Sequence, residues 1–250
     1  MTIAIQIPKD VDAVEYLTSF STFFTDHPEM RSALLGTQDS LRQASQLIEE
    51  PLGMLACLTA EEEAAAFLYY GLKARDYSVP QYGKLHRHGD KLKLVVFAQA
   101  MHQYFFGKMP TGLRSAIRIE RDGHKPKTSH VFNFNGYSVV QDDILETIVI
   151  SGKGEGSHDV AINAAVDDIL SDITPSGFTP GSHIKKVANR RNLCLYGDPE
   201  RKLRLRHSEE INHFKTNCVS MVTLGFLVFN SPNPTSSMVK LVDCIFDKIR

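Results

Sequence analysis

The sequence predicts a mostly α-helical fold, in which a helical bundle carries a small β insertion. Two observations support this. Apolar residues recur at helical spacing near both ends of the chain, and the pattern changes to alternation in the middle. A chain of 250 residues can bury one large core, and no linker is long enough to force a split. We therefore expect a single helical domain over residues 1–250, with the insertion at about 114–151.

Four helices are predicted in the first hundred residues. Thr59 is followed three residues later by Glu62, a capping-box pattern that predicts a helix start at Thr59. Pro80 and Gly83 end that helix, and Gly107 follows the last one. The predicted ranges are about 10–25, 28–48, 59–75 and 84–106.

The second half begins with the β insertion. Residues 116–121 approach strict alternation before a turn at Asp122-Gly123, and Asn135-Gly136 suits a tight hairpin. A further short strand is predicted at 147–150. Prolines and glycines between 175 and 181 indicate a break in the chain. The later helices are predicted at about 160–173, 206–229 and 238–249.

Composition favours a cytoplasmic protein. The net charge is -1, so any affinity for nucleic acid must come from a local patch. The four cysteines show no C-x-x-C spacing, which argues against a metal ribbon, and we expect no metal and no cofactor. The N-terminal apolar run is too short for a signal peptide. The longest late apolar run, 221–229, is about half a membrane span, so no membrane association is expected.

Charged residues on two consecutive apolar helices predict a polar centre. Glu62 and Glu63 lie on the first, and His88 and Lys91, three residues apart, share one face of the second. Buried charges are costly unless they pair or act, so we expect Glu63 to face the interior and to approach a basic partner. Two other interpretations stay open. The acids, Glu61 included, can stabilise the positive end of the helix dipole, or the charged residues can form a purely structural ion-pair network.

A basic segment spans residues 183–207, where ten basic or potentially basic residues face only two acids. Such a cluster can neutralise phosphates, and Tyr196 can stack on a base. The alternative is a solvated loop and helix end. The residues expected to bind RNA or an acidic partner are Arg190, Arg191, Tyr196, Asp198, Arg204 and Arg206.

These features together resemble the AbiV-like abortive-infection proteins of the HEPN superfamily. The matching features are the acid-rich helix, His88-x-x-Lys91, and Arg190 or Arg191 followed by LYGD at 195–198. The similarity covers roughly residues 50–105 and 185–213. It implies a compact helical bundle, a homodimer and a role in phage defence. Many HEPN proteins are metal-independent ribonucleases with an R-x(4–6)-H motif, in which Arg polarises phosphate and His transfers protons.

Three pairs in this chain have that spacing, and Arg206 with His213 fits best, because residues seven apart share one helix face. The other two are Arg118 with His124 and Arg201 with His207. The leading hypothesis is therefore an antiviral defence protein that acts on RNA or the translation machinery. Two alternatives remain: a non-catalytic binder of a phage or host protein, and an antitoxin-type partner of a nucleotidyltransferase.

Overall fold

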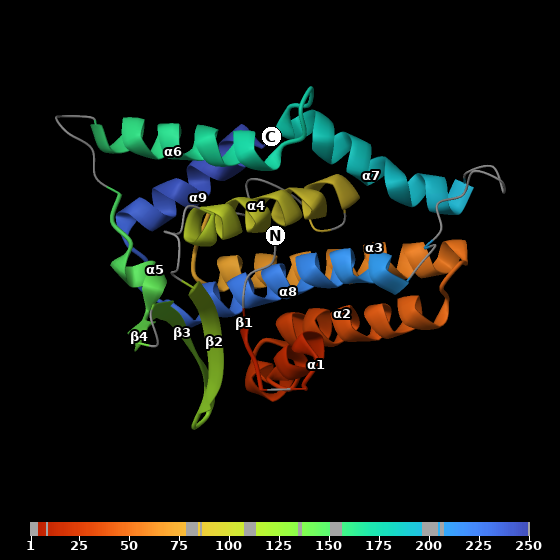
Figure 1. Cartoon of the computed structure of the whole chain (residues 1–250), viewed down its shortest axis with the longest axis horizontal. Coiled ribbons are helices and arrows are strands. Elements are labelled where there is room, and N and C mark those ends of the chain that lie inside the picture. The colour runs from red at the N-terminus through yellow and green to blue at the C-terminus, as the bar shows by residue number, and fades with distance from the viewer. Residues whose placement is uncertain are drawn as a thin grey trace.

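A computed structural model describes residues 5–8, 10–78, 85, 87–107, 114–134, 137–150, 157–196, 205 and 208–249. The fold is mostly α-helical with one small sheet, which confirms the predicted fold class (Figure 1). None of the described helices combines the length and apolar composition that a membrane crossing requires. The helices are α1 (Ala13–Thr18), the 3₁₀ segment η1 (Ser21–Phe24), α2 (Pro28–Gln46), α3 (Pro51–Ala74), α4 (His88–Phe106), α5 (Ile144–Thr147), α6 (Ser157–Ile173), α7 (Pro180–Tyr196), α8 (Ser208–Asn230) and α9 (Ser236–Lys248).

Helices α3 and α8 form the centre of the bundle. Figure 1 shows α2 on one side of this pair and α4 on the other, with α6, α7 and α9 beyond α4. The central helices approach closely because glycines face each other: a Cβ added to Gly71 would lie 3.1 Å from the Gly225 carbonyl oxygen. Phe67 packs between Phe24 and Phe226, with ring centroids 5.2 and 5.3 Å away. This aromatic cluster anchors the core.

The sheet packs at one end of the bundle, in the order β1 (Ile5–Gln6), β2 (Arg114–Asp122), β3 (Lys125–Phe134) and β4 (Tyr137–Asp142). Strands β2, β3 and β4 are antiparallel neighbours, as predicted, and Gly123 turns the first hairpin with φ of 57°. The Asn135-Gly136 turn lies outside the described residues. The insertion is not separate from the core, because Ile117 and Ile119 are fully buried in it.

Two details of the β prediction were wrong. Strand β1 was not predicted, and it pairs in parallel with β2, with Ile5 opposite Ile117. The strand expected at 147–150 is absent from the described residues there, since α5 covers Ile144 to Thr147 and residues 148–150 are irregular. A run of only four apolar and β-branched residues does not distinguish a strand from a short buried segment.

Helix α3 begins earlier than the capping-box pattern predicts. Pro51 occupies its first turn, a position where the missing N–H costs nothing. Thr59 therefore lies in mid-helix, where its hydroxyl donates to the Leu55 carbonyl at 3.0 Å. Glu61 and Glu62 are consequently far from the helix start, and both are buried. The interpretation of these acids as partners of a helix dipole is wrong.

Helix α7 was not predicted. Pro180 and Gly181 were predicted to be part of a break, but Pro180 opens the helix. Thr179 caps it, because its hydroxyl accepts from the Ser182 N–H at 3.2 Å. The helix continues to Tyr196, so the first half of the basic segment is a regular helix that packs on α3 and α4.

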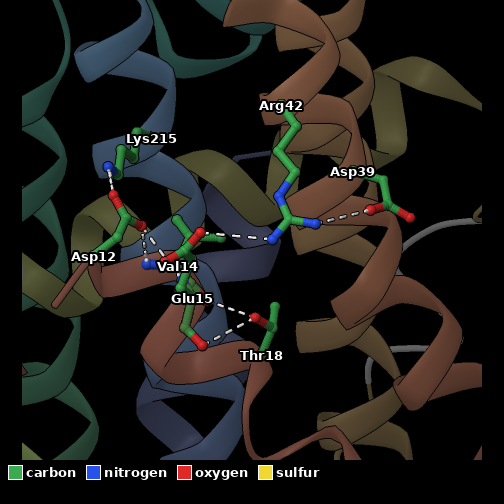
Figure 2. Close-up of polar contacts among 7 residues, drawn as sticks. All are labelled: Asp12, Val14, Glu15, Thr18, Asp39, Arg42 and Lys215. Carbon is green, nitrogen blue, oxygen red and sulfur yellow. Dashed lines mark hydrogen bonds and ion pairs between the residues drawn. The ribbon is translucent and has the colours of Figure 1, made fainter.

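Charged contacts anchor the short helix α1 to its neighbours (Figure 2). Asp12 caps α1 by accepting from the Val14 N–H at 2.8 Å, and it also pairs with Lys215 of α8. Glu15 pairs with Arg42 of α2 at 3.5 Å. A cavity of about 290 Å³ adjoins these residues. The charged groups that line this cavity pair mainly with one another, and these pairs hold α1 against α2 and α8.

Candidate functional site

The strongest candidate for a functional site is a cavity of about 210 Å³ between α3, α4, α7 and α8. Polar and ionisable side chains from all four helices reach it, against an apolar wall that includes Leu92, Val96 and Ile184. Convergent polar groups in a partly apolar pocket are the usual features of a small-ligand or active site. The polar lining residues are Glu61, Gln99, His183, Arg190, His213 and Asn217.

Helix geometry explains why these side chains converge. His183 and Arg190 are seven residues apart on α7, and His213 and Asn217 are four apart on α8, so each pair shares one helix face. Glu61 comes from α3, which is apolar nearly all round and buried at the centre. The cavity thus has a buried carboxyl inside, while Arg190 and His213 are exposed enough to meet solvent at its edge.

Glu61 is only 4% exposed, and its environment favours the neutral carboxylic acid. The pKa of Glu61 is raised from its ordinary 4.5 to about 7, mainly by burial, and the charge of Glu62 contributes in the same direction. A hydrogen bond from Asn217 and the charge of Arg190 act in the opposite direction but do not cancel the effect of burial. The Asn217 amide donates to Glu61 Oε1 at 2.6 Å, which leaves Oε2 to carry the proton.

The two histidines at the cavity have the opposite tendency. Partial burial lowers the pKa of His213, and the charge of Arg190 lowers it further. The pKa of His183 is also lowered, by burial first and then by the charges of Arg190 and Lys186. Since an ordinary histidine titrates near 6.5, both imidazoles are mainly neutral at pH 7 and can accept a proton.

A second cavity, of about 550 Å³, adjoins the first. The two share Gln99, Ile173, His213 and Asn217. The second cavity adds polar groups from α4, α6 and α8: His102, Gln103, Asp172, Thr216 and Ser220. The Gln103 amide donates to Asp172 Oδ2 at 3.0 Å. Together the cavities form one polar cleft beside α8.

The predicted polar centre exists, but Glu62 takes the role expected of Glu63. His88 Nδ1 lies 2.8 Å from Glu62 Oε1, and Lys91 Nζ lies 3.4 Å from Glu62 Oε2. Glu63 is half-buried beside Gly36, and among the described residues it makes no salt bridge. The charge of Lys91 acts on it, yet burial still raises the pKa of Glu63. This cluster is a neighbour of the cavity, because Glu61 and Glu62 adjoin on α3.

The structure separates the residues expected to bind RNA or a partner. Arg190 enters the cavity, whereas Tyr196, at the end of α7, is 82% exposed. Arg191 lies in α7, and nothing of its side chain is described. Asp198, Arg204 and Arg206 lie outside the described residues, so the predicted pair of Arg206 and His213 is not visible as a pair. His213 is present at the cavity with Arg190.

Asn217, Gln99 and the role of Glu61 were not predicted from the sequence. A lone amide in a helix carries no sequence signal. The shared face of His183 and Arg190 would have been a signal had α7 been predicted, because their seven-residue spacing is meaningful only on a helix.

No family model, curated protein or solved structure matches the chain. The resemblance to HEPN proteins therefore stays a prediction.

Proposed function

We propose that this protein is a metal-independent endoribonuclease whose active site is the cavity between α3, α4, α7 and α8. The observation that carries the proposal is the presence of Arg190, His213 and Glu61 around one cavity. They supply a cation for phosphate, a neutral imidazole and a carboxylic acid that holds its proton near neutral pH. This set is sufficient for RNA cleavage by general acid–base catalysis.

In the proposed reaction the substrate's own 2′-hydroxyl is the nucleophile. Its oxygen forms a bond to the adjacent phosphorus while His213 takes the hydroxyl proton. The bond from phosphorus to the 5′-oxygen breaks, and Glu61 gives that oxygen a proton. The products are a 2′,3′-cyclic phosphate and a 5′-hydroxyl end, so atoms and charges balance without an added reactant.

The pKa shifts suit these assignments. At one pH the base must be unprotonated and the acid must be protonated. This is easiest when the environment lowers the pKa of the base and raises the pKa of the acid. Here the pKa of His213 is lowered and the pKa of Glu61 is raised to about 7. Both groups are therefore in the required state slightly below neutral pH.

Arg190 has the electrostatic role. Its guanidinium is a cation with five donors in a planar fork that matches phosphate oxygens. Charge builds up on the phosphate oxygens during the attack, and a cation positioned there lowers the barrier. His183, on the same face of α7, is placed to donate or accept a further hydrogen bond.

The test is cleavage of a labelled RNA by purified protein in EDTA. We expect cleavage by the wild type and loss of about 10²-fold or more with His213→Ala or Arg190→Ala. Matched controls are His124→Ala and Arg31→Ala, which remove exposed side chains far from the cavity in sequence and outside its lining. Activity that persists unchanged in His213→Ala, or that requires a divalent metal, would contradict the proposal.

The cellular role we attach to this chemistry is antiviral defence, which rests on the resemblance to abortive-infection proteins. A phage plaque assay with the same variants tests it. Protection by the wild type and by His124→Ala, with loss in His213→Ala, is the expected result. Equal protection by all variants would show that defence does not depend on RNA cleavage at this site.

One observation favours a second candidate function, binding without catalysis. The last turn of α7 exposes large apolar side chains, since Leu193 is 40%, Leu195 38% and Tyr196 82% exposed. Apolar groups gathered at one helix end are typical of a protein-binding surface. A binder of a phage or host protein would keep its partner after His213→Ala and lose it after Tyr196→Ala.

A further inference from the structure

The cavity beside the proposed cleavage site has a different chemical character from the site itself. In the first cavity Arg190 supplies positive charge. Among the described residues that line the second, there is no lysine or arginine, and the groups are amides, hydroxyls, imidazoles and one carboxylate. Phosphate binding favours cations, whereas the edge of a nucleobase is recognised by neutral hydrogen-bonding groups. The second cavity is therefore suited to a base.

Size and position support the same assignment. A cavity of about 550 Å³ lies within the range of pockets that hold small organic ligands. It shares His213 and Asn217 with the first cavity, so a nucleotide whose phosphate meets Arg190 and His213 would place its base in the second. Its lining includes polar side chains that are themselves nearly buried: His102 is 7%, Gln103 8% and Ser220 5% exposed.

The orientation of the amides determines which groups they offer to a ligand. Gln103 uses its NH₂ to donate to Asp172 Oδ2, and Asn217 uses its NH₂ to donate to Glu61 Oε1. The Asp172 carboxylate only accepts hydrogen bonds, so Gln103 must turn its NH₂ toward it, and Asn217 turns its NH₂ toward the unprotonated oxygen Oε1 of Glu61. With its NH₂ on Asp172, the Gln103 amide can offer its carbonyl oxygen to a ligand as an acceptor, beside the carboxylate of Asp172.

We propose that this second cavity is a nucleobase subsite that selects a base with an exocyclic amino group, and that it disfavours uracil. Adenine, cytosine and guanine each carry an NH₂ that can donate to the carbonyl of Gln103. Uracil has no exocyclic amino group, and its one donor at that edge, N3–H, lies between two carbonyl oxygens that would face the acceptors of Gln103 and Asp172. The proposal deepens the ribonuclease function and rests on it for the placement of the phosphate.

The test uses the 3′-monophosphates of adenosine, cytidine, guanosine and uridine, titrated separately into the intact protein by calorimetry. We expect the three amino-bearing nucleotides to bind about tenfold more tightly than uridine monophosphate, the effect of one well-made hydrogen bond. Gln103→Met removes one of the two acceptors and leaves the Asp172 carboxylate, so it should reduce the preference. Gln43→Met, an exposed residue of α2, is the matched control and should keep the preference.

Arg190→Ala should weaken all four nucleotides alike and leave the preference intact, because Arg190 contacts phosphate in this account. Equal affinity for the four in the wild type, or an unchanged preference in Gln103→Met, would overturn the subsite. The comparison of the four nucleotides in the wild type needs no substitution, so it tests the subsite even if a variant does not fold. Base preference without RNA cleavage would refute the ribonuclease function alone, whereas cleavage with equal affinities would refute the subsite alone.

Discussion

Glu61 sits in the candidate cavity with a pKa of about 7, well above its ordinary 4.5, because it is buried. Between these two pH values the folded protein binds a proton at Glu61 that the unfolded chain has released. The free energy of unfolding therefore falls as pH rises from 4.5 to 7. The shift corresponds to about 3 kcal/mol.

Glu61→Gln should remove this dependence while keeping an oxygen that accepts from Asn217. Relative to the wild type, the variant should gain stability by about 3 kcal/mol between pH 4.5 and pH 8. Urea unfolding at both pH values measures the difference. A constant difference between variant and wild type would show that Glu61 titrates normally and would remove its role as an acid.

His130 of β3 is 1% exposed, and both its ring nitrogens lack a hydrogen-bond partner among the described residues. Burial lowers its pKa from 6.5 to about 4. The unfolded chain then binds a proton that the folded protein does not, so stability falls as pH drops from 6.5 to 4.

His130→Leu should therefore stabilise the protein most at low pH, by about 3 kcal/mol at pH 4 relative to pH 8. The phenyl rings of Phe106 and Phe132, with centroids 5.5 and 3.9 Å from the imidazole, offer an apolar site for the new side chain. Thermal melts across this pH range test the expectation, with exposed His124→Leu as control. A loss of stability in His130→Leu at every pH would mean that the imidazole makes a hydrogen bond after all.

At the scale of elements, the close approach of α3 and α8 places the site. A Cβ added to Gly225 would lie 2.6 Å from Phe67 Cδ1, a ring that is itself packed between two others. Gly225→Ala must therefore push the two helices apart, at a cost of about 1–3 kcal/mol. Because Glu61 and Asn217 come from these helices, their 2.6 Å hydrogen bond should lengthen as well.

Gly89→Ala is the matched control, since a Cβ there meets nothing within 4 Å and alanine favours helix in α4. Chemical denaturation should show Gly225→Ala destabilised and Gly89→Ala unchanged or stabilised. Equal stability of the two variants would contradict the packing described for α3 and α8.

The sequence predicted long periodic helices well and their starts poorly. The apolar spacing of α2, α4, α8 and α9 is sustained over several turns, and these helices were found. Helix α3 was started eight residues late because Thr59 and Glu62 fit a local cap, although burial of the preceding apolar residues extends the helix back to Pro51. Helix α7 was missed because Pro180 and Gly181 were taken as a break.

The site could be predicted only in part. The sequence predicted that a glutamate of one helix pairs with His88 or Lys91 of the next, but it assigned the pair to Glu63, whereas Glu62 makes both contacts. Which of the consecutive glutamates faces inward depends on helix phase, and the late start of α3 concealed it. The cavity is lined by residues between 61 and 217 in the sequence. Residues so far apart come together only through tertiary packing, so the sequence alone could not predict the cavity.

At the scale of the whole molecule, a net charge of -1 means that any RNA affinity must come from a local patch, and the exposed cations of α7 are the patch that the proposed function requires. Affinity for single-stranded RNA should fall steeply with salt, because bound counterions are released. Lys185→Ala should reduce the slope of log affinity against log salt by about 0.7. Lys240→Ala, in α9, removes a lysine that already pairs with Asp159 and should leave the slope unchanged. The same slope in both variants would exclude α7 as the RNA surface.

The homodimer that the resemblance implies stays a prediction.

The most direct test of the central claim is the pH dependence of RNA cleavage in EDTA, measured for the wild type and Glu61→Gln. The proposed chemistry predicts a bell-shaped profile for the wild type. The rate rises below pH 6.5 as His213 loses its proton and falls near pH 7 as Glu61 loses its own. Glu61→Gln should cleave about 10²-fold more slowly or worse, without the fall near pH 7. An unchanged rate and profile in Glu61→Gln, or no cleavage by the wild type at any pH, would contradict the account.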